Sequence, residues 1–437
     1  MQWAVRKKRS KFHYHESIDT SQLLLRGFWY QLRKGNCFFL EMQYEYFVAF
    51  TSALGGLLFG IELGIINQVL LMKPFLKSYG LYDARNTKDF TSDDYELYSS
   101  IIVASFLVGC VISAISLIFT TDTAPRKKFI FYGSVLFSIG GFLQGLAIND
   151  VMWMLIIGRL AGGLGVGVLS CLVPLYISEI ASTEKRGKMT SLQQLMITVG
   201  IALANVINAI LAVSFDNELQ WRLALGSQGV FGIIMVFSVL KLPESPRFLV
   251  YVGRDAEALV ALAQLRQNLI DNPVVAKEFK DIKESIEAQR KLGQVSWSDA
   301  STGVFRERMW IGIIIQMFQQ WTGINAVMYY SSKLFIGMGF DVHTATTVTT
   351  TISSLVNVFG TFPGILAIEK YGRVNLLFIG GIGMSACMWG LFGITSMIEN
   401  AKEVNPFYGI IGAILMYVYV VFFASSWGPG AWYCLFI

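Results

Sequence analysis

Residues 101–119 read IIVASFLVGCVISAISLIF, a run without a single charged side chain. Residues 410–437 likewise contain no Asp, Glu, Lys or Arg. An α-helix rises about 1.5 Å per residue, so about 20 apolar residues cross the hydrocarbon layer of a bilayer. We therefore interpret both stretches as membrane-spanning helices.

The composition excludes an ordinary soluble domain. Of 437 residues, 54% are hydrophobic and only 15% are charged, whereas soluble domains carry about 25% charged residues. The apolar residues come in long blocks, which predict an all-α integral membrane protein with about ten spans. The expected spans are 46–72, 99–120, 128–148, 152–178, 190–213, 221–241, 308–336, 346–368, 374–397 and 407–437.

One long polar stretch, residues 242–307, divides the spans into six and four. We therefore expect a tail (1–45), a six-helix bundle (46–241), a linker (242–307) and an incomplete second bundle (308–437). Inside the linker, residues 271–273 (Asp-Asn-Pro) and Asp255 are typical helix starts. Apolar residues follow each start at helical spacing and predict short amphipathic helices: Val275, Phe279, Ile282 and Ile286 in one, and Leu259, Leu262 and Leu269 in the other.

Two short loops resemble each other. One runs from Asp122 to Lys128 after the second expected span, and the other from Glu369 to Arg373 after the eighth. This offset indicates a duplicated six-helix unit, as in many membrane proteins with internal repeats. The second unit has only four expected spans, so a shortened gene model or splice product and a true ten-span protein are both open hypotheses.

The distribution of basic residues predicts the orientation. Without residues 241–308, Lys and Arg number 16 on the side of the N-terminal tail and 6 on the other side. Short cytoplasmic loops are enriched in Lys and Arg, so we expect the tail and the linker in the cytoplasm. The basic tail is interpreted as disordered, with contact to anionic lipid as the alternative.

Four motifs resemble, in sequence order, those of the sugar porter family of the major facilitator superfamily. They are Gly158-Arg159 with Gly162, Gly163, Gly165 and Gly167; residues 173–179 (VPLYISE) with Arg186-Gly187; residues 243–247 (PESPR); and residues 319–325 (QQWTGIN) with Tyr329-Tyr330. The resemblance implies twelve spans in two bundles, a central sugar site and alternating access. The chain departs from the family in the loop that contains Pro125, and it ends within the tenth span.

Amides and hydroxyls inside spans suit a solute with many hydroxyl groups, because each can donate or accept. Gln194, Thr198, Asn205 and Asn208 share one helical stripe, and Thr350, Ser354, Asn357 and Thr361 share another. The alternative is that they hold helices together. Use of both Gln320 and Asn325 would require the helix to unwind near residues 322–323. The resemblance implies sugar contacts by Gln194, Gln319, Gln320, Asn325, Asn357 and Trp432.

Two charged residues lie where charge is costly. Glu62 is in the middle of the first expected span, and Arg159 begins the fourth. Each costs about 2.5–3.5 kcal/mol at a helix centre, so we expect both to face the interior and to pair. The resemblance implies that Glu62 carries a proton, with a static ion pair as the alternative. It also implies a cytoplasmic gate that latches the bundles, formed by Asp122, Glu179, Arg186, Glu244, Arg247, Glu369 and Arg373.

We therefore expect a multi-pass protein of the plasma membrane that moves a monosaccharide together with a proton. A non-transporting sugar sensor and an inactive truncated chain are the alternatives. No enzyme is expected, because no nucleophile–base set is visible and the three histidines avoid the spans. The five cysteines show no metal spacing or disulfide framework. We expect no cofactor, no metal and no nucleic-acid partner.

Overall fold

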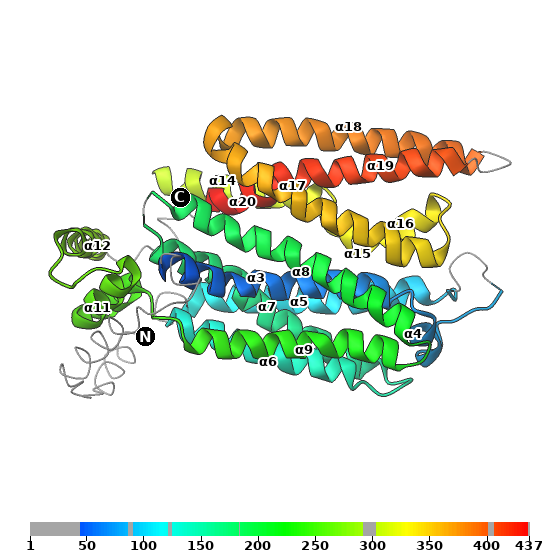
Figure 1. Cartoon of the computed structure of the whole chain (residues 1–437), viewed down its shortest axis with the longest axis horizontal. Helices are drawn as coiled ribbons and strands as arrows, with labels where there is room; N and C mark the ends of the chain where they lie inside the picture. The colour runs from blue at the N-terminus through cyan, green and yellow to red at the C-terminus, as the bar shows by residue number, and fades with distance from the viewer. Residues whose placement is uncertain are drawn as a thin grey trace, which may run out of the picture.

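The computed structural model describes residues 44–85, 91–120, 125–182, 184–291, 303–400 and 406–435. Within these ranges the protein is built from helices, and its extended pairing is one isolated bridge between Tyr82 and Thr91. The long helices run along the longest axis of the molecule (Figure 1). This arrangement agrees with the predicted all-α membrane fold.

Six long helices form the N-terminal half. They are α3 (Tyr44–Val69), α5 (Tyr95–Thr120), α6 (Arg126–Gly145), α7 (Met152–Ile180), α8 (Arg186–Ser214) and α9 (Leu219–Leu240), with the short α4 (Lys73–Ser78) after α3. Glycines let these helices approach closely. A Cβ added to Gly163 of α7 would lie 2.1 Å from the backbone oxygen of Phe106 in α5. The glycine-rich part of α7 therefore serves helix packing.

The C-terminal half continues with a second group of helices. They are α14 (Gly303–Trp321), α15 (Ile324–Tyr329), α16 (Ser331–Gly337), the π-helical turn η2 (Thr344–Thr349), α17 (Thr350–Tyr371), α18 (Arg373–Asn400), α19 (Pro406–Phe422), the π-helical turn η3 (Phe423–Trp427) and α20 (Gly428–Leu435). In Figure 1, α17 lies against α8 of the N-terminal half, while α18 and α19 lie farther out.

The seventh expected span is interrupted where the sequence indicated. Helix α14 ends at Trp321 and α15 begins at Ile324, because Gly323 adopts a left-handed backbone with φ +82°. The Tyr419 hydroxyl donates to the backbone oxygen of Thr322 at 2.8 Å, which satisfies a carbonyl at the break. The π-helical turn η3 in the tenth expected span was not anticipated. Pro429, which lacks a backbone N–H, follows that turn.

Eight helical segments of the described part are long and apolar enough to cross a membrane, by length and composition. They are Tyr44–Val69, Tyr95–Thr120, Met152–Ile180, Arg186–Ser214, Leu219–Leu240, Thr344–Ala367, Arg373–Ile398 and Phe407–Ala431. Helix α6 begins with three basic residues, 126–128, and α14 contains Arg306, Glu307 and Arg308. The count of ten spans stays a prediction.

Three helices form in the linker: α10 (Pro246–Val252), α11 (Asp255–Arg266) and α12 (Pro273–Lys291). Helices α11 and α12 begin at the two predicted start signals. Val275 and Ile286 of α12 are buried as expected. Leu269 was expected on the apolar face of α11, but this prediction is wrong. The helix ends before it, at Arg266, and the Leu269 side chain is 68% exposed.

The linker helices lie at one end of the helical body in Figure 1, and α4 and α16 lie toward the other. We call the end that bears α4 and α16 the distal end. The predicted tail up to residue 43 and Asp122 lie outside the described residues, as do the side chains of Glu369 and Trp432.

Candidate functional site

A buried ion pair lies inside the N-terminal half. Glu62 of α3 and Arg159 of α7 are both fully buried, and Nη1 of the guanidinium contacts Oε1 of the carboxylate. Arg159 also donates from Nε to the backbone oxygen of Ile102 at 3.1 Å, and its guanidinium carbon lies 5.0 Å from the centre of the Phe106 ring. The structure thus brings together the two charged residues that the sequence singled out.

Each of the two buried charges depends on the other. An isolated charge in a dry interior is strongly disfavoured, whereas opposite charges in contact offset much of that cost. Loss of either partner leaves the other uncompensated. The charge of a carboxylate in this position is either offset by contact with the guanidinium or removed by binding of a proton.

Two of the expected sugar-contacting amides meet at the π-helical turn of the tenth span. Gln319 of α14 is nearly buried and donates from Nε2 to the backbone oxygen of Trp427 at 3.1 Å. Gln194 of α8 is also nearly buried and faces Gly428, where an added Cβ would lie 3.0 Å from its Nε2. This turn therefore lies between the two halves of the protein.

The other expected sugar contacts with described side chains are Gln320, Asn325 and Asn357. Gln320 is exposed and accepts a hydrogen bond through Oε1 from Nδ2 of Asn325, so the two bridge the break at Gly323. Asn357 of α17 is 3% exposed, and its Oδ1 has no hydrogen-bond partner among the described residues. Within the same residues, no hydrogen bond joins Gln320 to Gln194.

Two asparagines of the α8 stripe hold helices together. Asn208 donates from Nδ2 to the backbone oxygen of Ile65 at 3.1 Å. Asn205 accepts from Nε2 of Gln68 at 2.9 Å. These contacts fit the helix-packing alternative, because the amides satisfy partners on α3.

A polar contact that was not predicted from the sequence closes the distal end across the two halves. Nδ2 of Asn67 donates to the Ser331 hydroxyl at 2.8 Å, and the Ser332 hydroxyl donates to Oδ1 of Asn67 at 3.3 Å. Gln68 donates to the hydroxyl of Thr350 at 2.9 Å. The signal in the sequence was the pair of adjacent amides, Asn67 and Gln68, at the end of an apolar span.

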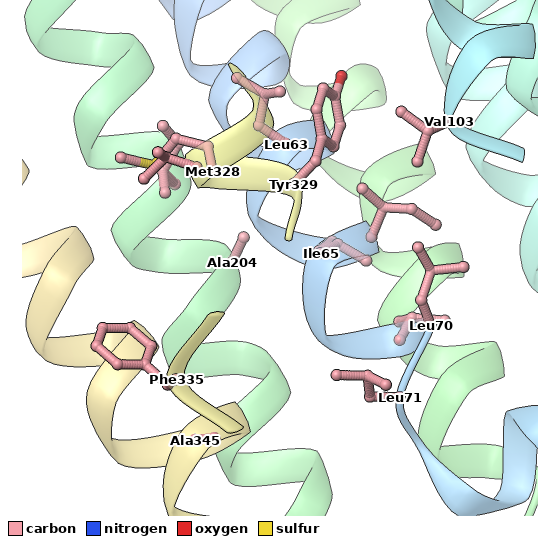
Figure 2. Close-up of a cluster of buried hydrophobic side chains, with 14 of the residues drawn as sticks. Leu63, Ile65, Leu70, Leu71, Val103, Ala204, Met328, Tyr329, Phe335 and Ala345 are labelled. Carbon is pink, nitrogen blue, oxygen red and sulfur yellow. The ribbon is translucent and has the colours of Figure 1, made fainter. Parts of the chain in front are cut away.

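Apolar side chains close the same region. Leu63 and Leu70 from the N-terminal half belong to one buried cluster with Tyr329 and Phe335 from the C-terminal half. Figure 2 shows these side chains around α15 and α3. We call the amide–hydroxyl contacts and this cluster together the distal closure.

The expected cytoplasmic gate is only partly described. Arg126 pairs with Glu179 at 3.1 Å, and Glu244 accepts from the backbone N–H groups of Lys127 at 3.2 Å and Ser245 at 3.1 Å. Burial raises the pKa of Glu244, although these two donors act in the opposite direction. All these residues belong to the N-terminal half and the linker.

A second set of ion pairs fastens the linker to the N-terminal half. Glu45 of α3 lies 3.2 Å from Nη1 of Arg266 in α11 and 3.7 Å from Nζ of Lys185. Arg266 also pairs with Glu278 of α12. The predicted gate did not include Glu45, Arg126 or Arg266. In the described part, the ion pairs of Glu179 and Glu45 join elements of the N-terminal half and the linker.

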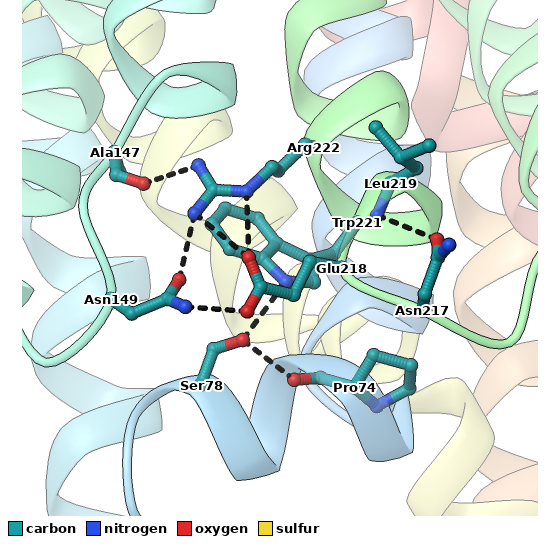
Figure 3. A network of polar contacts seen from close by, with 9 residues as sticks. All are labelled: Pro74, Ser78, Ala147, Asn149, Asn217, Glu218, Leu219, Trp221 and Arg222. Atoms are coloured by element: carbon teal, nitrogen blue, oxygen red, sulfur yellow. Dashed lines mark hydrogen bonds and ion pairs between the residues drawn. The ribbon is translucent and has the colours of Figure 1, made fainter.

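Polar contacts also fasten the loops of the N-terminal half at the distal end (Figure 3). Arg222 donates from Nη2 to Oδ1 of Asn149 at 2.7 Å and to Oε2 of Glu218 at 3.2 Å. Nε1 of Trp221 donates to the Ser78 hydroxyl at 3.3 Å. These bonds connect α4, the loop before α7 and the start of α9.

No group of three or more His, Cys, Asp or Glu side chains in the described ranges could hold a metal ion. Between the ends of the described helices, the buried polar groups named above are amides, hydroxyls and the ion pair of Glu62 and Arg159. Interrupted helices between two packed halves, with polar groups turned inward, are features of membrane transporters.

The comparisons name the family. The family model described as "Sugar (and other) transporter" matches residues 48–435. The chain therefore belongs to the sugar porter family of the major facilitator superfamily, whose members are transporters rather than enzymes.

Two curated relatives illustrate the similarity. The low-affinity glucose transporter HXT1 of Saccharomyces cerevisiae is 32% identical over 388 residues, 87% of this chain and 66% of its own length. Sugar carrier protein C of Ricinus communis is 34% identical over 396 residues, 87% of this chain and 73% of its own length. The chain spans about two thirds of the yeast relative.

Two solved structures are similar to the fold. One is the proton:xylose symporter XylE bound to 6-bromo-6-deoxy-D-glucose, with 28% identity and a TM-score of 0.75 over 89% of this chain and 81% of that chain. The other is XylE from E. coli in a partially occluded inward open conformation, with 26% identity and a TM-score of 0.72 over 90% and 87%.

Proposed function

We propose that this protein carries a monosaccharide across the plasma membrane together with a proton, by alternating access between its two halves. The observation that carries the proposal is the fully buried pair of Glu62 and Arg159. Membership of a sugar transporter family supports the sugar, and the similarity to a proton:xylose symporter supports the proton.

The proton would bind to Glu62. A bound proton removes the charge of the carboxylate and ends its attraction for Arg159. Because the guanidinium stays charged at any physiological pH, it must then find another acceptor. Proton binding would therefore change which groups of the interior attract each other, and that change is a means of coupling to a conformational step.

The sugar would lie between the halves near the interrupted seventh and tenth spans. Gln194 and Gln319 approach the turn at residues 427–428, and Gln320 and Asn325 flank the break at Gly323. Amides both donate and accept, which suits the hydroxyl groups of a sugar. Asn357, with an unpartnered amide oxygen, and Trp432 complete the proposed set.

Replacing Gln320 with Ala should weaken sugar binding by roughly 1–3 kcal/mol, the cost of leaving hydroxyl groups unpaired in a desolvated site. Folding should change little, because the Gln320 side chain is exposed. Equilibrium binding of a labelled sugar to purified protein measures the effect. The matched control is Gln289→Ala on the exposed face of α12. If the Gln320→Ala protein is obtained in low yield but binds sugar with normal affinity, Gln320 serves helix packing.

We further propose that the distal end faces the outside and that the linker helices face the cytoplasm. A Cys at Ser285 in α12, or at Ser10 in the tail, should resist an impermeant thiol reagent in intact cells and react after permeabilisation. A Cys at Asp93, exposed near the distal end, should react in intact cells. The unsubstituted chain gives the background. Reaction of Ser285→Cys or Ser10→Cys in intact cells would reverse the orientation.

In this orientation the gate residues lie on the cytoplasmic side. We propose that Glu179, Arg186, Glu244, Arg247 and Arg373, with Asp122 and Glu369, latch the halves when the outside is open. The distal closure is then the outer gate. Its hydrogen bonds between α3 and α16 support an outer gate that is shut in this conformation.

A further inference from the structure

Tyr329, the last residue of α15, carries a buried hydroxyl without a partner. Its side chain is 3% exposed, and the hydroxyl oxygen makes no hydrogen bond to any described residue. In Figure 2, the ring stands between Leu63 of α3 and Val103 of α5. A residue of the C-terminal half therefore inserts a polar atom into the N-terminal half.

The surroundings of this hydroxyl lead directly to the buried ion pair. Leu63 follows Glu62 in the chain, and Val103 follows Ile102, whose backbone oxygen accepts from Arg159. The Tyr329 hydroxyl lies within electrostatic range of the Arg159 guanidinium without bonding to it.

Two other titratable groups of the described part lie within electrostatic range of Tyr329. Cys110 of α5 and the neighbouring Tyr330 also interact with it electrostatically. Arg159 meets Glu62 from α3 and the Phe106 ring from α5. Arg159 is thus the fixed positive charge of this region, and Glu62 is the carboxyl group paired with it.

We propose that the Tyr329 hydroxyl is the alternative acceptor for Arg159, and that this contact makes closure of the distal end depend on the proton at Glu62. The proposal rests on the proposed role of Glu62. With Glu62 ionised, the carboxylate holds the guanidinium. With Glu62 protonated, the guanidinium donates to the phenolic oxygen and thereby holds α15 against the N-terminal half.

The path from this contact to the distal closure is short. Tyr329 lies two residues before Ser331, and Ser331 and Ser332 at the start of α16 bond to Asn67 of α3. Helices α15 and α16 are separated only by Tyr330. An added attraction on Tyr329 therefore favours the same closed position of α16 that Asn67 stabilises.

Hydrogen–deuterium exchange of the full chain in lipid nanodiscs tests the proposal. The peptide covering residues 324–337 is followed at pH 5.5 and pH 7.5 after correction for intrinsic exchange. The native chain should be several-fold better protected at pH 5.5. Tyr329→Phe, which removes only an oxygen that has no hydrogen bond in the present structure, should lose this difference. Tyr330→Phe is the matched control and should keep it.

Glu62→Gln separates this inference from the proposed function. It should give the higher protection at both pH values, because the amide cannot hold Arg159 as a carboxylate does. If Glu62→Gln loses the pH dependence and Tyr329→Phe keeps it, the role of Tyr329 is refuted while that of Glu62 stands. If the native chain shows no difference, or Glu62→Gln keeps it, both fail.

A second variant covers poor folding of Tyr329→Phe. Arg159→Lys keeps the positive charge but has a shorter reach and a single nitrogen. It should therefore bond either Glu62 or Tyr329 less effectively and lose the pH-linked protection. A folded Arg159→Lys protein with native pH dependence would also refute the proposal.

Discussion

Replacing Glu62 with Gln should abolish accumulation of sugar against its gradient while sugar-for-sugar exchange continues. The amide keeps the volume of the side chain but cannot bind or release a proton near neutral pH. Exchange needs no return of an empty, deprotonated carrier, so it should persist. Purified protein in vesicles, with and without an imposed pH difference, measures both activities in one preparation.

A purely structural ion pair predicts a different result. Removing one partner of a buried pair costs about 3–5 kcal/mol, because the remaining charge is left uncompensated. Binding, exchange and yield would then fall together. The matched control is Glu218→Gln, whose half-exposed carboxylate pairs with Arg222 near the distal loops. Uphill accumulation by Glu62→Gln at the native level would falsify the coupling role.

Replacing Gly163 with Ala should strongly destabilise the N-terminal half. The new Cβ would lie 2.1 Å from the backbone oxygen of Phe106 and 3.2 Å from the Cα of Gly109, so α5 and α7 must separate. Overpacking of this kind costs about 1–3 kcal/mol or more, which exceeds the gain of up to about 1 kcal/mol in helix propensity. We expect a lower yield of folded protein and a melting temperature several degrees lower.

The neighbouring glycine provides the control. A Cβ at Gly162 would meet only Nε2 of Gln144, at 3.6 Å, which is an ordinary contact. Gly162→Ala should therefore be neutral or slightly stabilising, since alanine favours the helix. Equal melting temperatures for the two variants would show that the close approach of α5 and α7 does not depend on Gly163.

The sequence was sufficient for features that depend on neighbouring residues. Long apolar runs identified the principal helices, and Asp255 and Pro273 marked the starts of α11 and α12. The break at Gly323 was also foreseeable, because glycine tolerates a left-handed backbone that other residues avoid. The prediction for Leu269 was wrong because helical spacing alone does not determine where a helix ends.

The partners of the buried polar groups depended on the tertiary structure. The free-energy cost of a charge inside a span was enough to predict that Glu62 and Arg159 face inward. By contrast, Asn67 and Ser331 are 264 residues apart in the chain, and no local pattern relates them. Arg126 belongs to one of the two similar loops, but nothing in that loop indicated that it pairs with Glu179.

The proposed sugar set shows the same division. The sequence identified Gln194, Gln319 and Gln320 as amides inside spans, but it did not show that Gln319 bonds to the tenth span while Gln320 is exposed beside the break at Gly323. Helical periodicity fixes which residues share a face of one helix. Which helix that face meets is decided by the close packing of all the helices, and the sequence of a single span contains no information about it.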